Sequence, residues 1–245
     1  SGLKCEDTCG ISSNSKLIMF DFALDDYPDT LIVPDNFEDM FATSYSSGSR
    51  IFSASWGTES NDYTINSFYM DDFMYKFDDY NIIVAAGNSG DSGSGTVGSP
   101  ATAKNVISVG ASTNSLESFA EDFENHFSES DILSNKKYYE NITLINFSSR
   151  GPSSIGDPKP DLMSIGAHGF TPSNILKSSK DSQDESFSLF GGTSMAAPLV
   201  SGSAAILMEE MKKQFQDYDS FTIKNILMST ATDLQNDPFT QGSGL

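Results

Sequence analysis

Two short runs of the chain, residues 82–86 and 106–110, are apolar except for Ser108, and a glycine ends or follows each. A strand that is apolar on both faces is typical of the centre of a parallel sheet, where both faces are buried. Such a sheet needs helices on both sides, so this pattern predicts an α/β fold. The 245 residues, of which 38% are hydrophobic, suffice for one large domain with a sizeable core.

The elements around these two runs alternate between strand and helix patterns, as βαβ units do. We expect further strands at residues 17–23, 50–54 and 142–147, and helices at 37–45, 65–79, 193–213 and 222–229. Residues 113–141 are polar and acidic without firm periodicity, and we interpret them as an inserted surface excursion. No internal repeat is apparent, so residues 1–245 are treated as a single domain.

The chain is strongly acidic, with 34 Asp and Glu against 14 Lys and Arg and a formal net charge of −20. This charge argues against nucleic acid or anionic membranes as partners. It fits an extracellular, high-salt or cation-rich setting, or simply serves solubility. No apolar run reaches the roughly 18 residues of a membrane-spanning helix. Neither end resembles a natural terminus, so we expect a piece of a longer chain.

Residues 190–198, Phe-Gly-Gly-Thr-Ser-Met-Ala-Ala-Pro, place Ser194 where a glycine pair runs into a helix of small side chains. Free amides and the helix dipole favour negative charge at such a helix start, and a developing oxyanion carries that charge. Pro198 is expected near the helix start, where amide hydrogens have no intrahelical partner. Ser194 is therefore a candidate nucleophile, and the alternative is that Thr193 or Ser194 is an ordinary helix cap.

Two other segments place polar groups at strand ends. Asn88 leaves a central strand through glycine and could be a second oxyanion donor, although asparagine is also common in ordinary turns. Residues 51–58 end a strand with the only tryptophan, Trp56, and a glycine. Such a stretch can present free backbone groups to an extended peptide, or it can simply hold a buried aromatic ring. Residues 90–98 have a linker-like composition, but they follow a central strand at the edge where α/β sheets bind ligands.

Five segments occur in the order and at the spacings of one protease family: residues 53–57, 85–90, 96–100, 147–152 and 190–198. Together they resemble the subtilisin-like serine proteases, the subtilases, and Gly-Thr-Ser-Met-Ala-Ala-Pro is among the most specific of protease signatures. The resemblance covers essentially the whole chain except residues 113–141. It implies a three-layer parallel-sheet fold, incomplete at both ends, and a serine endopeptidase that acts on polypeptides outside the cell or at its surface.

The resemblance also implies roles for individual residues. Ser194 matches the nucleophile, and Asn88 matches the asparagine that joins the serine N–H in the oxyanion hole. The substrate-binding positions are Ser55, Trp56 and Gly57 on one wall, Ala86 and Gly87 on the opposite wall, and Gly98 at the pocket floor. A glycine at that floor leaves room for a large apolar side chain. No cofactor is required; the family often binds structural calcium, but no compact loop motif assigns a site here.

The chain departs from the family in one respect, because it contains neither the Asp-Ser/Thr-Gly motif nor the His-Gly-Thr-His motif. His126 lies in the acidic insertion, and His168 replaces part of a family loop, so neither is expected to act as base. Both missing motifs would precede Gly10. We therefore expect a prodomain or a missing N-terminal segment as a partner. The alternative is a catalytically inactive subtilase-like module for peptide binding or structure.

Overall fold

The computed structural model describes residues 10–22, 31–34, 37–115, 141–167, 169–172, 187–215 and 217–245. Its centre is a four-stranded parallel sheet in the order β1-β2-β3-β4. The strands are Ile51–Ala54 (β1), Asn81–Ala85 (β2), Ile107–Ser112 (β3) and Leu162–Ile165 (β4). Every residue of β2 and β3 is buried, as their apolar sequences predict. The expected parallel α/β fold is confirmed.

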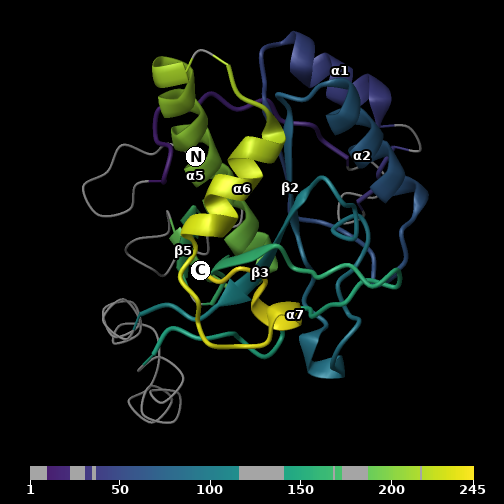
Figure 1. Cartoon of the computed structure of the whole chain (residues 1–245), viewed down its shortest axis with the longest axis vertical. Coiled ribbons are helices and arrows are strands. Elements are labelled where there is room, and N and C mark those ends of the chain that lie inside the picture. Colours follow the sequence, from purple (N-terminus) through teal and green to yellow (C-terminus); the bar gives the residue numbers. More distant parts are fainter. Residues whose placement is uncertain are drawn as a thin grey trace, which may run out of the picture.

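Helices cover both faces of this sheet and make three layers (Figure 1). Helices α1 (Glu38–Ser46) and α2 (Ile65–Lys76) lie on one side, and α5 (Thr193–Phe215) and α6 (Ser220–Thr230) on the other. The smaller elements are the 3-10 turn η1 (Gly90–Ser92), the helix α7 (Pro238–Gln241), and an antiparallel pair of strands, β5 (Gly169–Pro172) and β6 (Phe187–Phe190). β6 leads directly into the glycine pair before α5.

Strand β2 contributes to two hydrophobic cores, because successive side chains of a strand point to opposite faces. Ile82 and Val84 belong to the core beneath α1 and α2, whose filling is largely aromatic. Ile83 and Ala85 belong to the core beneath α5 and α6. The buried side of α5 carries many small side chains, and the helix contacts all four strands of the sheet. This close packing fixes the start of α5 relative to the strand ends.

Two expected strands are absent. Residues 17–22 form no strand, and Leu17 and Met19 are 62% and 82% exposed. An apolar run becomes a strand only when another strand pairs with its backbone, and among the described residues none does. Residues 142–147 form only an isolated antiparallel bridge between Ser112 and Leu144, followed by a turn. Further along the chain, the structure has a strand that the sequence analysis did not predict. This is β4, a short run directly after Lys-Pro-Asp.

The acidic excursion begins and ends at neighbouring points of the fold. Thr113 donates its N–H to the Thr143 carbonyl at 2.8 Å, and the Thr143 N–H donates to Thr113 Oγ1 at 3.0 Å. Residues 116–140 lie outside the described residues, and so does Ala23, the last residue of the strand expected at 17–23.

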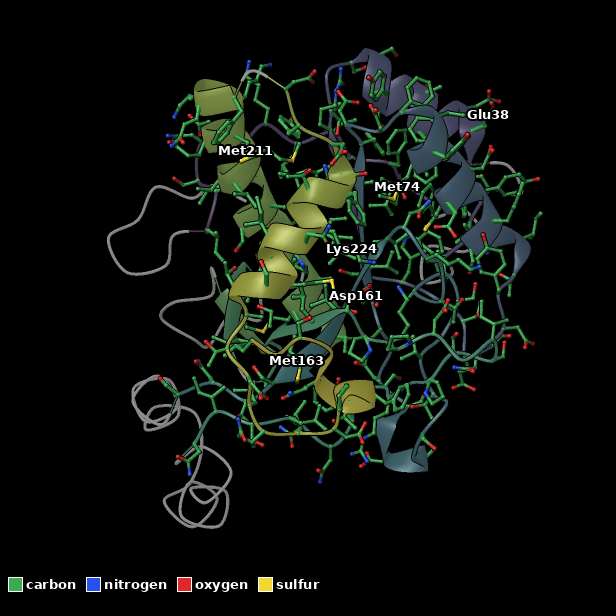
Figure 2. The ribbon with its side chains drawn as sticks, in the orientation of Figure 1. Glu38, Met74, Asp161, Met163, Met211 and Lys224 are labelled. Atoms are coloured by element: carbon green, nitrogen blue, oxygen red, sulfur yellow. The ribbon has the colours of Figure 1, made fainter. Side chains whose placement is uncertain are left out.

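A buried ion cluster joins the amino-terminal end of the sheet to α6. Asp161, directly before β4, accepts from Lys159 Nζ at 2.9 Å and from Lys224 Nζ at 2.8 Å. Figure 2 shows Lys224 on α6 beside Asp161. The carboxylate also accepts from the N–H and the hydroxyl of Ser108, the second residue of β3. All three charged side chains are largely or fully buried, so the pairing takes place away from water.

The cluster carries two ammonium groups and one carboxylate. Burial acts to raise the pKa of Asp161, but Lys159 and Lys224, with the hydrogen bond from Ser108, outweigh it and hold that pKa below its ordinary value. Burial and the neighbouring Lys159 lower the pKa of Lys224. Lys224 also donates to the carbonyls of Lys104 and Val106, at 3.0 and 2.8 Å, which ties α6 to the segment leading into β3.

Candidate active site

The candidate side chains gather at the carboxyl edge of the parallel sheet. Ser55 directly follows β1, and Asn88 follows β2 after two intervening residues. After β4, the Gly166 carbonyl accepts from Gly192 N at 2.6 Å, which brings the start of α5 to the same edge. Because the carboxyl ends of parallel strands meet at one edge, Ser194 comes to lie beside residues far from it in sequence.

Ser194 is the second residue of α5 and is half-buried. Gly192 before it has a φ of +148°, a conformation that L side chains rarely adopt, so the entry into the helix requires glycine. Within the described part of the chain, the Ser194 N–H has no hydrogen-bond partner. It is one of the unpaired amides at the positive end of a helix, where negative charge is stabilised.

Asn88 is oriented by Thr193. Its Oδ1 accepts from the Thr193 N–H at 2.9 Å and from Thr193 Oγ1 at 3.0 Å, and Gly87 N–H donates to the same hydroxyl at 3.2 Å. Since Oδ1 is engaged by two donors, Nδ2 is the outward end of the amide, and no described residue accepts from it. The role of Thr193 was not foreseen, although a hydroxyl next to the nucleophile was visible in the motif.

The two unpaired donors border one space. The position that a Cβ would take on Gly192 lies 3.6 Å from both Asn88 Nδ2 and Ser194 N, and 3.7 Å from Asn88 Oδ1, which already accepts from Thr193. An oxygen held there by two N–H donors would have the environment of an oxyanion hole. Glycine is required at position 192 for its φ, and because glycine has no Cβ, this space also stays open.

Ser194 and Ser55 exchange two hydrogen bonds. Ser194 Oγ donates to the Ser55 carbonyl at 3.1 Å, and Ser55 Oγ donates to the Ser194 carbonyl at 2.9 Å. The position of Pro198 differs from the expectation. It is the sixth residue of α5 and so lies beyond the first amides, which have no helical partner. An N–H at position 198 would donate to the Ser194 carbonyl, so proline leaves that acceptor vacant and Ser55 fills it.

The segment after β1 leaves its backbone open. Within the described residues, the N–H groups of Trp56 and Gly57 have no hydrogen-bond partner. The Trp56 ring packs against Phe22 and Phe37, with ring centroids 6.5 and 5.7 Å apart. The ring therefore packs against the aromatic core, as one interpretation expected, and the pairing of the open backbone with an extended peptide stays a prediction.

The opposite segment has its backbone groups engaged. Ala86 N donates to the Val109 carbonyl at 2.9 Å, its carbonyl accepts from Gly98 N at 3.1 Å, and the Gly87 carbonyl accepts from Ser149 N at 3.0 Å. These bonds fix the backbone of Ala86 and Gly87, whose place on the wall of a substrate pocket stays a prediction. A Cβ on Gly98 would lie 1.9 Å from the Thr58 carbonyl oxygen, so glycine is required there by close backbone approach. The pocket floor expected at Gly98 stays a prediction.

A base for Ser194 is not found among the described residues, because His126 and His168 both lie outside them. In the same part of the chain, no group of three or more His, Cys, Asp or Glu side chains could hold a metal ion. None of the helices described is long and apolar enough to cross a membrane.

Comparison with known proteins agrees with this geometry. The profile of the subtilase family, peptidase S8, matches residues 9–244. The chain is 26% identical over 294 aligned residues to the serine protease/ABC transporter B family protein tagD of Dictyostelium discoideum, covering 95% of this chain and 16% of that protein. It is 33% identical over 176 residues to pyrolysin of Pyrococcus furiosus, covering 66% of this chain and 12% of pyrolysin.

Among solved structures, the chain is similar in fold to the prenylagaramide maturation protease PagA. The TM-score is 0.58 at 19% sequence identity, and the match covers 84% of this chain and 61% of that one. The chain thus spans about a sixth or less of the length of the two curated relatives, and under two thirds of PagA.

Proposed function

Because this chain belongs to the subtilase family, we propose that it is the serine-bearing part of a subtilisin-type serine endopeptidase. Membership supports serine protease activity in general. The observation that carries the finer proposal is that Ser194 N–H and Asn88 Nδ2, two donors without a partner among the described residues, border one space at Gly192. A helix cap alone would not explain an asparagine whose Oδ1 is held by two donors of Thr193, so that its Nδ2 has no acceptor among the described residues.

In the proposed reaction, Ser194 Oγ attacks the carbonyl carbon of the scissile peptide bond. A histidine from a part of the protein outside this chain accepts the hydroxyl proton, and an aspartate orients that histidine. The carbonyl oxygen becomes an oxyanion and accepts hydrogen bonds from the Ser194 N–H and Asn88 Nδ2. The histidine then protonates the leaving amine, an acyl-enzyme remains on Ser194, and water releases the second product.

The proposed substrate is an extended polypeptide. The open backbone of Trp56 and Gly57 supports pairing with such a strand, and the bonded segment at Ala86 and Gly87 supports a fixed wall opposite to it. Gly98 completes the proposed substrate-binding set. This chemistry requires no cofactor. The family resemblance and the acidic charge favour an extracellular or cell-surface location, which is part of the proposal.

Labelling with a fluorophosphonate probe tests the proposal. The full-length protein is expected to hydrolyse a peptide substrate and to take up one probe per molecule at Ser194. The isolated 245-residue chain should label far more slowly, because loss of the histidine in subtilisin itself lowers kcat by about 10⁶-fold. A full-length protein that binds peptides but neither cleaves them nor labels would instead be an inactive subtilase-like module.

Replacing Asn88 by alanine should lower kcat of the full-length protein by about 10²–10³-fold, the loss measured for the corresponding asparagine of subtilisin. KM should change little, since the donor acts mainly on charge that develops in the transition state. Steady-state kinetics on a peptide substrate measures both constants. Asn225→Ala, on the exposed side of α6, is the control and should leave both unchanged. A rise in KM at constant kcat would assign Asn88 to substrate binding instead.

A further inference from the structure

We propose that the Ser55 hydroxyl is a positioning group for catalysis, and that it acts by replacing the helix hydrogen bond that Pro198 removes. This inference rests on the proposed function. Ser55 was expected only as part of the substrate-binding wall, through its backbone. Its side chain instead bonds to the backbone of Ser194, the residue that supplies both the nucleophile and one oxyanion donor.

The vacancy at the Ser194 carbonyl follows from the sequence of α5. In an α-helix the N–H of residue i donates to the carbonyl of residue i−4, so position 198 serves the carbonyl of residue 194. Proline has no N–H, and the exposed ring of Pro198 leaves this carbonyl without its helical donor. Ser55 Oγ, 2.9 Å away, supplies the donor from another element of the fold.

The bond from Ser55 Oγ to the Ser194 carbonyl fixes the proposed substrate-binding segment relative to the start of α5. Ser55 begins the segment whose open backbone faces a substrate strand, and Ser194 carries the oxyanion N–H. The return bond, from Ser194 Oγ to the Ser55 carbonyl, holds the nucleophile against the same residue. A small shift of the Ser194 peptide would move both its N–H and its hydroxyl, and misplacement of reacting groups by about 1 Å can lower rates about 10²-fold.

The hydroxyl of Ser53, on β1 two residues before Ser55, provides a matched comparison. Ser53 Oγ lies 3.0 Å from Ser201 Oγ, within hydrogen-bond distance, so it also joins β1 to α5, but through a side chain two turns beyond the nucleophile. Ser201 already donates to the Ala197 carbonyl, so the helix backbone there does not depend on Ser53. Ser53→Ala therefore removes a strand-to-helix contact without touching the Ser194 carbonyl.

The test is a double-mutant cycle in the full-length protein, with peptide hydrolysis and fluorophosphonate labelling as readouts. Ser55→Ala should lower kcat by about tenfold with KM within about twofold, as expected for a group that acts on the transition state. Ser55→Thr, which keeps the hydroxyl, should restore most of the rate. In a Pro198→Ala background the helix regains its own donor, so adding Ser55→Ala should cost little. Ser53→Ala should match the parent protein in both readouts.

The outcomes separate this inference from the function on which it rests. If the parent protein cleaves and labels but Ser55→Ala does so equally well, the positioning role is wrong and the proposed function stands. An equal loss from Ser55→Ala in the parent and Pro198→Ala backgrounds would also overturn it, because the hydroxyl would then act by another route. A parent protein that neither cleaves nor labels overturns both.

Discussion

Ser194→Ala is expected to abolish peptide hydrolysis by the full-length protein, with a loss in kcat of about 10⁶-fold, the value measured for the nucleophile of subtilisin. The reason is that acyl transfer through Ser194 Oγ becomes impossible, and only the oxyanion donors and substrate binding still act on the transition state. Fluorophosphonate labelling should vanish together with hydrolysis. Active-site titration and steady-state kinetics on one peptide substrate measure both losses.

The fold should survive this change, because among the described residues Ser194 Oγ makes one hydrogen bond, to the Ser55 carbonyl, at a half-buried position. Ser203→Ala is a matched control on the same helix, since the one partner of Ser203 Oγ in the described part of the chain is the Leu199 carbonyl. It should keep the activity of the parent protein. Labelling that persists in the Ser194→Ala variant would place the nucleophile elsewhere and remove the basis of the proposed function.

Asp161→Asn is expected to lower the free energy of unfolding by about 3–5 kcal/mol, the typical cost of leaving a buried charge uncompensated. The substitution leaves the ammonium groups of Lys159 and Lys224 facing each other without a carboxylate. Urea unfolding of the full-length protein, followed by tryptophan fluorescence and circular dichroism, measures the change. At neutral pH the effect should appear in the stability of the fold and not at the candidate active site, because the cluster lies at the end of the sheet away from Ser194.

The two lysines should rank below the aspartate in a set of matched variants. Lys224→Met keeps the Lys159–Asp161 pair but leaves the carbonyls of Lys104 and Val106 without their donor, so its cost should be intermediate. Lys159→Met keeps the Asp161–Lys224 pair with all its hydrogen bonds and should cost least. The exposed pair Lys213–Glu209 is the control, and Lys213→Met should leave the unfolding midpoint unchanged. A different order would mean that net charge in the cluster does not decide its stability.

The pH dependence of unfolding gives the same cluster a second signature. The pKa of Asp161 is lowered in the folded state, so the unfolded chain takes up the proton first as the pH falls below about 4. The stabilisation from Asp161 is therefore present above that pH and is lost as the pH falls through the folded-state pKa. Parent and Asp161→Asn should differ most near pH 7 and converge in acid. A constant difference between pH 7 and pH 3 would contradict the lowered pKa.

Sequence reasoning located the elements whose pattern is local. The apolar strands β2 and β3 and the helices α1, α2, α5 and α6 were expected close to their observed bounds, because burial on one or both faces repeats with the period of the element. Segments that depend on a partner were not predictable in this way. Residues 17–22 have the composition of a strand, but no strand among the described residues pairs with them, and β4 is a short strand that pairs with β3 in spite of a weak pattern.

The sequence by itself determined the chemistry of the candidate site: a serine at a helix start, an asparagine after a central strand, and the family to which both belong. Only the tertiary structure decided how these residues constrain one another. Thr193 turns the Asn88 amide, and Ser55 occupies the carbonyl that Pro198 leaves vacant, across 139 residues of sequence. The physical reason is that a hydrogen bond depends on distance and angle between atoms, which the folding of β1, β2 and α5 onto one sheet edge sets and local sequence does not.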